Sequence, residues 1–379
     1  MTDVRALRER LVDVLRNDGG LTRDDLIRAF ATVPRELFLA DGFNLGDAGF
    51  LRPGDDGFLS GAYRNDALVT KFDNGRPVSS SSQPSLMALM IEALGIAPGM
   101  RVLEIGAGTG YNAALMAHIG ADVTSVDVQP DVAARAAAAL KTAGVTGARV
   151  RVGDGYLGEP SGAPYDRVIV TVGVTGVSPH WLAQLVPGGL MLAPVAHAGN
   201  NPVLRVWTKP AAGREEPGWP ATDDIWADGV CGAGFMAAAG PLAARYPWSH
   251  PDPVRVPDGV TPSVQIPPRW NQPLDGLSYH DLWFAVGAWD RRATGGPFDG
   301  GSGCVLVDET GAGGAAIRAD GSVLAAGAHA AEYANDAGIL LDRWLDAGRP
   351  GIEQWRAPLV LAGDPAAPIY VPREWSLFA

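Results

Sequence analysis

The chain has 379 residues, more than one ordinary domain holds, so we expect two domains. Hydrophobic residues make up 47% of it and charged residues 19%, which is typical of a folded globular protein and excludes a disordered one. The formal net charge of −12 argues against a protein whose main partner is a nucleic-acid backbone. An anionic substrate would therefore need local positive groups or backbone donors.

The sequence lacks any apolar run long enough to span a membrane, and its first 16 residues are charged and amphipathic, unlike a secretory leader. We therefore expect a cytoplasmic protein without a membrane partner. The two cysteines, Cys231 and Cys304, lie far apart without a CxxC pattern or a nearby histidine pair. Neither a disulfide nor a metal site is indicated, and buried thiols are expected.

Helices are expected over the first 40 residues. Leu7, Leu11 and Leu15 share one face of the first helix. Thr22, with Asp25 three positions later, resembles a capping box at the start of a second helix.

The pattern breaks up between residues 42 and 74, where frequent glycine and aspartate predict loops and short strands. A serine run at 79–82 then precedes Gln83, Pro84 and a predicted helix at 86–94. The plain alternative for four serines is a flexible linker.

Short β-branched runs alternate with helical stretches between residues 101 and 206. The predicted strands cover residues 102–105, 123–126, 149–152, 167–172 and 189–194. Alternation of this kind predicts an α/β fold, a doubly wound parallel sheet with helices on both faces.

The composition changes after Pro210 to proline, glycine and tryptophan, and all eleven tryptophans lie at or beyond Trp181. Strands are predicted at 303–307, 315–318 and 322–325, with a hairpin turn at Asp320 and Gly321, followed by a helix at 334–345. We expect three parts, namely an N-terminal helical cap and lead-in at 1–75, a cofactor domain at 76–240, and a smaller α+β domain at 250–379.

The sharpest local pattern is VLEIGAGTGYN at 102–112, a strand that leads into Gly106, Gly108 and Gly110 and then a helix. Glycines are needed where a backbone turns tightly and approaches a ligand. Nucleotide dehydrogenases share such a turn, so it is moderately specific. Glu104 favours another ligand, because its carboxylate would oppose a pyrophosphate but suits a sulfonium or amino group.

Acidic residues follow the next two strands. Asp127 comes about 20 residues after the first glycine, where a carboxylate can accept both ribose hydroxyls, although it could instead cap a helix. Asp154 is placed to accept from an adenine amino group, although Asp-Gly alone can be a plain turn. Ligands bind at the carboxyl ends of parallel strands, so we assign both acids and their neighbours Val128 and Gly155 to the cofactor site.

Several ordered blocks resemble the protein-L-isoaspartate O-methyltransferase family. GDGYLGEPSGAPYDRVIVTVG at 153–173 and Pro-Gly-Gly at 187–189 carry the likeness, and the blocks at 33–35, 63–66 and 82–84 follow the same order. The resemblance implies a Rossmann-like methyltransferase domain that uses S-adenosylmethionine to methylate a carboxylate.

The resemblance covers roughly residues 20–240 and also implies a site residue. In the family the serine before Gln-Pro contacts the reacting carboxylate, and this is Ser82 here. The segment PVSSSSQP is longer than the usual form, so Ser81 or Ser80 could take that role. A carboxylate is already ionised at neutral pH, so its methylation requires neither a general base nor a metal.

The family resemblance implies two end uses. A repair enzyme methylates L-isoaspartyl residues, whereas a second branch methylates one aspartate of a ribosomally made precursor peptide crosslinked by an ATP-grasp ligase and yields an aspartimide. The serine segment and the tryptophan-rich extension favour the second use, with the precursor peptide as partner. Arg291, Arg292 and the hairpin at Asp320 are candidate contacts for it, although ordinary surface charge and an ordinary turn explain them equally simply. A methyltransferase-like peptide-binding protein without activity stays an alternative.

Overall fold

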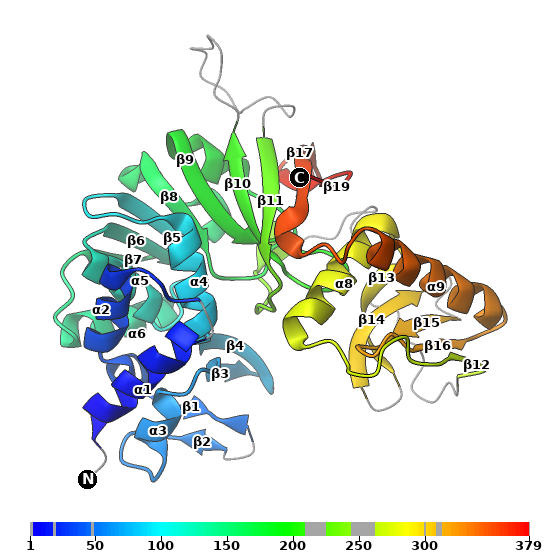
Figure 1. Ribbon diagram of the computed structural model, residues 1–379. Coiled ribbons are helices and arrows are strands. Elements are labelled where there is room, and N and C mark those ends of the chain that lie inside the picture. The colour runs from blue at the N-terminus through cyan, green and yellow to red at the C-terminus, as the bar shows by residue number, and fades with distance from the viewer. Residues whose placement is uncertain are drawn as a thin grey trace. The chain divides into compact units, whose positions relative to one another are not determined.

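The computed structural model describes residues 3–17, 20–46, 49–208, 225–243, 262–298, 301–307 and 313–378 (Figure 1). By internal contacts these residues form two compact units. The first takes in the described residues up to 172 together with 178–193, and the second takes in 173–177, 194–208 and those from 225 onward. None of the described helices is long and apolar enough to cross a membrane.

The first unit begins with helices α1 (Val4–Asn17) and α2 (Asp24–Thr32) and the 3-10 helix η1 (Arg35–Leu39). Leu7, Leu11 and Leu15 are buried along one face of α1, which confirms the predicted helix. The predicted capping box is wrong. Arg23, not Thr22, precedes α2, and no side chain of this segment caps it.

A carboxylate from another helix replaces that cap. Glu92 lies on α4 (Pro84–Leu94), and its Oε1 accepts the backbone N–H groups of Thr22 and Arg23, each at 2.7 Å. Spacing within one segment cannot reveal an acceptor that arrives from about 70 residues away.

A small antiparallel sheet has the strand order β2-β1-β3-β4. Its elements are β1 (Phe43–Asn44), β2 (Phe50–Leu51), α3 (Phe58–Ala62), β3 (Leu68–Asp73) and β4 (Arg76–Ser81). Ser79 to Ser81 lie on β4, where Ser80 pairs with Val69 and Ser81 with Leu68 of β3, and Ser82 directly follows the strand. The alternative of a flexible serine linker is therefore wrong.

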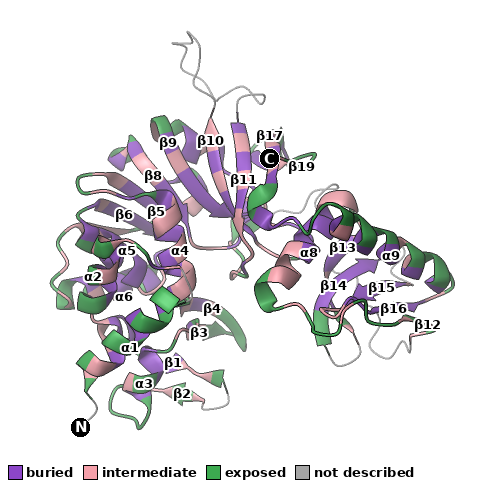
Figure 2. Ribbon diagram, viewed as in Figure 1, coloured by how far each residue is buried: buried purple, intermediate pink, exposed green. Residues whose placement is uncertain are grey.

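The main sheet of the first unit is parallel, in the order β9-β8-β5-β6-β7. Its elements are β5 (Arg101–Ile105), α5 (Tyr111–Ile119), β6 (Asp122–Asp127), α6 (Pro130–Thr142), β7 (Ala148–Val152), η3 (Gly155–Leu157), η4 (Pro160–Gly162), β8 (Tyr165–Val170), α7 (Pro179–Ala183) and β9 (Leu185–Pro194). Consecutive residues of β5 and β6 are buried, so both faces of the sheet are covered (Figure 2). This arrangement confirms the predicted Rossmann-like α/β fold.

The second unit holds two antiparallel arrangements, β18-β17-β11-β10 with β19 on β17, and β12-β16-β15-β14-β13. Its elements are β10 (Val203–Thr208), β11 (Ile225–Cys231), η6 (Gly240–Ala243), β12 (Val264–Ile266), α8 (Gly276–Trp289), β13 (Ala293–Phe298), β14 (Gly301–Val307), β15 (Gly314–Ile317), β16 (Val323–Ala326), α9 (Ala330–Asp346), η7 (Ile352–Gln354), β17 (Trp355–Ala362), β18 (Ile369–Pro372) and β19 (Ser376–Leu377).

The predicted hairpin and helix of the second unit are present. β15 pairs with β16 across a turn where Gly321 has a φ of +75°, and α9 follows. Helix α8 was not predicted. Six successive residues of it, from Leu282 to Gly287, are buried, so the sequence shows no amphipathic period there. The domain boundary expected near 240–250 falls partly on residues outside the described ranges, and the three-part division stays a prediction.

Candidate functional site

The turn after β5 requires glycine for two reasons. Gly106 has a φ of +99°, and a Cβ there would lie 2.8 Å from the Thr171 hydroxyl oxygen. Gly108 has a φ of +52°, and its Cβ would lie 3.0 Å from the carbonyl oxygen of Ser80. Gly110 then serves as the N-cap of α5. The turn therefore packs against Thr171 and β4 at the carboxyl end of the sheet, which is where ligands of such sheets bind.

The Thr171 hydroxyl stabilises this turn by hydrogen bonding. Its hydroxyl lies 2.7 Å from the Gly106 carbonyl oxygen and 3.0 Å from that of Ile105, and it donates a hydrogen bond shared between them. We did not assign Thr171 from the sequence. Its signal was present, because the block at 153–173 that resembles the family contains a strand that ends in this threonine.

Glu104 lies inside the sheet and does not present a free carboxylate. Its side chain is fully buried, with Oε1 accepting from Asn112 Nδ2 at 2.7 Å and Oε2 from the Ser125 hydroxyl at 2.6 Å. Burial raises the pKa of Glu104 to about 7. The carboxylate thus braces β5 against α5 and β6, and a direct contact with the cofactor stays a prediction that this geometry does not favour.

Asp127 ties the end of β6 to the glycine turn. Its Oδ2 accepts the Gly108 N–H at 3.1 Å, and its Oδ1 accepts the Gln129 N–H at 2.9 Å. Burial raises the pKa of Asp127. Helix α6 has Gln129 as its N-cap, so Asp127 precedes the cap position. The next residue, Val128, is 54% exposed and offers an apolar surface beside the turn.

Asp154 follows β7 and is exposed. One of its oxygens accepts the Tyr156 N–H at 2.9 Å, so the local turn that the sequence allowed is present. Gly155 packs against β5, because a Cβ there would lie 2.9 Å from Ile105 Cγ2. Strands β5, β6 and β7 are neighbours, so the glycine turn, Asp127 and Asp154 meet at one edge of the sheet.

The four serines at 79–82 alternate between buried and half-buried. Ser79 and Ser81 are buried, whereas Ser80 and Ser82 are half-buried. The Ser81 hydroxyl oxygen faces the protein interior and accepts from Arg35 Nη2 at 3.4 Å. Of the two serines assigned to the carboxylate, Ser82 is therefore the more accessible.

Arg35 is a residue whose importance sequence reasoning missed. It is fully buried and donates to five oxygen atoms, namely the carbonyls of Ala62, Arg64, Asp66 and Ser82 and the hydroxyl of Ser81. Burial lowers its pKa to about 10, so the guanidinium stays charged at neutral pH. The block at 33–35 that resembles the family marked the position but not its role.

Polar contacts pin the β3–β4 hairpin to the start of α6. Lys71 Nζ donates to Gln129 Oε1 at 2.8 Å and pairs with Asp131 at the same distance. Gln129 Nε2 in turn donates to the Val78 carbonyl at 2.9 Å. The serine strand is thus held beside the β6 end that carries Asp127.

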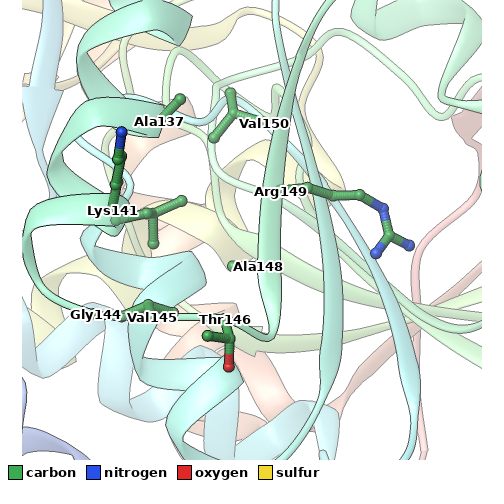
Figure 3. Close-up of a pocket in the computed structure, with 9 residues that line it drawn as sticks. Ala137, Lys141, Gly144, Val145, Thr146, Ala148, Arg149 and Val150 are labelled. Carbon is green, nitrogen blue, oxygen red and sulfur yellow. The ribbon is translucent and has the colours of Figure 1, made fainter.

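Two hollows open on the first unit. A cavity of about 510 Å³ is lined by η1, the β3–β4 hairpin, Gly108, Thr109 and α6, so it adjoins the glycine turn and Ser79. A second hollow of about 430 Å³ lies between α6 and β7, and Figure 3 shows the Arg149 side chain extending away from Lys141 there. None of the residues that line the second hollow belongs to the predicted site.

Two of the candidate contacts in the second unit, Arg292 and Asp320, bond to other residues of the same unit. Arg292 pairs with Asp290 at 2.7 Å and with Asp336 of α9 at 2.8 Å. Asp320 Oδ1 accepts from the Ser322 N–H within the hairpin turn.

Burial raises the pKa of the Cys231 thiol to about 12, so this cysteine is not suited to act as a nucleophile.

The chain is similar in sequence to known protein-L-isoaspartate O-methyltransferases. A family model described as protein-L-isoaspartate(D-aspartate) O-methyltransferase matches residues 6–216. A protein-L-isoaspartate O-methyltransferase of Thermotoga maritima is 38% identical over 192 residues, which are 50% of this chain and 55% of that protein. One from Anaeromyxobacter dehalogenans is 48% identical over 136 residues, 36% of this chain and 65% of the relative. Both matches span less than two thirds of the relative.

Other likenesses extend further. The protein-L-isoaspartate O-methyltransferase 1 of an Anaeromyxobacter species is 39% identical over 191 residues, 50% of this chain and 81% of the relative. A solved structure of a protein-L-isoaspartate O-methyltransferase aligns with 96% of this chain and 99% of its own, with a TM-score of 0.53 and 26% sequence identity. That alignment includes most of the second unit.

Proposed function

The chain belongs to the protein-L-isoaspartate(D-aspartate) O-methyltransferase family, and we propose that it transfers a methyl group from S-adenosylmethionine to an aspartyl-type carboxylate of a peptide or protein. One observation carries this proposal. The glycine turn and two acidic strand ends lie at one edge of the sheet, and the serine strand β4 contacts that turn at Gly108. A binding protein without activity would not need this combination.

The residues at this edge fit the cofactor. At Gly106 and Gly108 a Cβ would meet neighbouring atoms, so the close turn at this edge requires glycine. Asp127 and Asp154 supply acceptors suited to hydroxyl and amino groups, and exposed Val128 supplies an apolar contact for a flat ring. The cofactor would bring an electrophilic methyl group to this edge.

The protein's own task is then to hold the acceptor. A carboxylate is ionised at neutral pH, so positioning and removal of water replace proton transfer. The Ser82 hydroxyl donates to one oxygen of the acceptor carboxylate and leaves the other free to accept the methyl group. Arg35 fixes the carbonyl of that same residue at 3.1 Å.

The relatives favour an L-isoaspartyl acceptor. All of the proteins named above are described as L-isoaspartate methyltransferases. The solved structure aligns with 96% of this chain, so a C-terminal unit does not by itself point to a dedicated precursor peptide. This alignment weakens one of the two arguments for a precursor-peptide acceptor, the argument from the tryptophan-rich extension.

The serine segment favours a second candidate acceptor, one aspartate of a ribosomally made peptide crosslinked by an ATP-grasp ligase. PVSSSSQP continues through β4 to the point where the acceptor would lie. After methylation the nitrogen of the next peptide unit attacks the ester carbonyl, loses its proton and expels methanol, which leaves an aspartimide. That ring closure needs no group of the enzyme.

Intact mass measurement separates these candidates. The full chain and S-adenosylmethionine are incubated with an L-isoaspartyl peptide and, separately, with a crosslinked acidic precursor peptide. Gain of a methyl group on the first indicates repair, and gain of a methyl followed by net loss of water on the second indicates aspartimide formation. If neither peptide is methylated, the proposed function is wrong.

A further inference from the structure

Arg35 is a buried charge with no carboxylate in ion-pair contact among the described residues. The Asp66 carboxylate acts on it only through space and is itself paired with Arg64 at 2.7 Å. All five oxygen atoms that accept from it are neutral, and its Nε has no hydrogen-bond partner in the described structure.

Such an arrangement is costly. Buried charges in proteins are usually paired, since water that stabilised the ion has been removed. Here the guanidinium also lies 5.8 Å from the centre of the Tyr111 ring, which offsets part of that cost. A buried cation that hydrogen bonds but has no anion in direct contact would be stabilised by an anion that binds close to it.

The position of Arg35 indicates which anion. Its Nη2 donates to the Ser82 carbonyl and to the Ser81 hydroxyl, so it contacts the two serines at the end of β4. On the premise of the proposed function, we propose that Arg35 is a positioning residue whose buried positive charge draws the acceptor carboxylate to Ser82. It acts through the serine strand and does not touch the acceptor.

A positive charge close to Ser82 would offset the repulsion between the negatively charged chain and an acceptor carboxylate. A net charge of −12 repels a carboxylate at long range, where salt screens it. The buried charge of Arg35, which contacts the Ser82 carbonyl, acts at short range through protein, where the effective dielectric constant is lower than in water. The alternative is that Arg35 merely joins the segments around Ala62, Arg64 and Asp66 to β4.

A pair of peptides distinguishes charge from scaffolding. The first is the peptide that the enzyme methylates, and the second carries a carboxamide in place of the accepting carboxylate. Affinities of both are measured for the full chain with S-adenosylhomocysteine bound. We expect Arg35→Gln to reduce the carboxylate-over-carboxamide preference about tenfold, the scale of one charge-assisted interaction. Arg35→Lys, which keeps the charge, should largely retain that preference.

Arg5→Gln is the matched control, because its side chain is 86% exposed and pairs with Glu9 at the surface, away from Arg35. We expect it to leave the preference unchanged. If Arg35→Gln weakens both peptides equally, Arg35 is only a scaffold and the inference is overturned. Loss of the preference in Arg35→Lys would also contradict it.

A measurement on the unaltered protein covers the case in which Arg35→Gln does not fold. A buried charge is screened weakly, so the carboxylate preference should not fall between about 0.05 and about 0.5 M salt. A preference that disappears with salt arises from surface charges and overturns the inference. Absence of S-adenosylhomocysteine binding and of methylation would instead refute the proposed function, so the two failures are distinguishable.

Discussion

At the residue scale, Glu104 links the stability of the protein to pH. Its pKa is about 7 in the folded protein and near 4.5 when exposed, so between these values the unfolded chain ionises first. The contribution of this group to folding stability is therefore full below about pH 4.5 and is lost as the pH rises through about 7.

Glu104→Gln should remove that dependence. We expect the melting temperature of the variant, relative to the unaltered protein, to be higher at about pH 8 than at about pH 5, with an underlying change on the order of 3 kcal/mol. Thermal unfolding at both values tests this, with exposed Glu9→Gln as control. The same difference at both pH values would contradict the account.

Ser82 and Ser81 should respond differently to removal of the hydroxyl. We expect Ser82→Ala to lower kcat/KM about 10- to 100-fold without changing cofactor affinity, since one hydrogen bond to a charged acceptor is lost. Ser81 is 2% exposed and bonded to Arg35, so Ser81→Ala should mainly lower the free energy of unfolding, by about 1 kcal/mol. Steady-state kinetics and chemical denaturation of both variants decide. Equal losses of activity would reject the assignment.

Site residues could be predicted from the sequence where their position relative to a strand fixes their place in the fold. Asp127 and Asp154 could be placed because acids after successive parallel strands must lie at one edge of the sheet. The direction of the Glu104 side chain could not be predicted, because strand alternation was hidden in a segment buried on both faces. Arg35 was missed because four of its five partners are backbone carbonyls, which leave no trace in residue type.

At the element scale, the β3–β4 hairpin depends on the Gln129 side chain, which bridges Lys71 and the Val78 carbonyl. Gln129→Ala removes both hydrogen bonds. We expect faster amide hydrogen exchange in β4 and a decrease in kcat/KM of about fivefold, because the serine strand loses its support. Thr142→Ala, at the other end of α6, is the control. Unchanged exchange in β4 would show that the hairpin is held by other contacts.

Elements differed in how well their sequence revealed them. The parallel strands were found because β-branched runs alternate with helical segments, and the boundaries moved by a few residues, as β9 shows by beginning at Leu185. Helix α8 was missed because burial on all sides removes the helical period. The serine strand β4 was ambiguous because serine has no strong strand preference, and its pairing with β3 is a tertiary fact.

At the scale of the whole molecule, the net charge of −12 should oppose an acidic acceptor. We expect kcat/KM for a peptide with additional acidic residues to rise about two- to fivefold from low salt to about 0.3 M, because screening weakens the repulsion. A version of the peptide with lysine in place of those acids should show the opposite trend. Initial rates over a salt series test this, and a falling rate for the acidic peptide would contradict it.

The central claim is that this chain forms a carboxyl methyl ester. The most direct test supplies methyl-labelled S-adenosylmethionine with the L-isoaspartyl and precursor peptides and then treats each peptide with mild base. We predict that at least one peptide takes up label and that the label leaves as methanol, either as the aspartimide ring closes or when base cleaves the ester. Label that resists base, or no transfer to either peptide by protein that binds S-adenosylhomocysteine, would contradict the account.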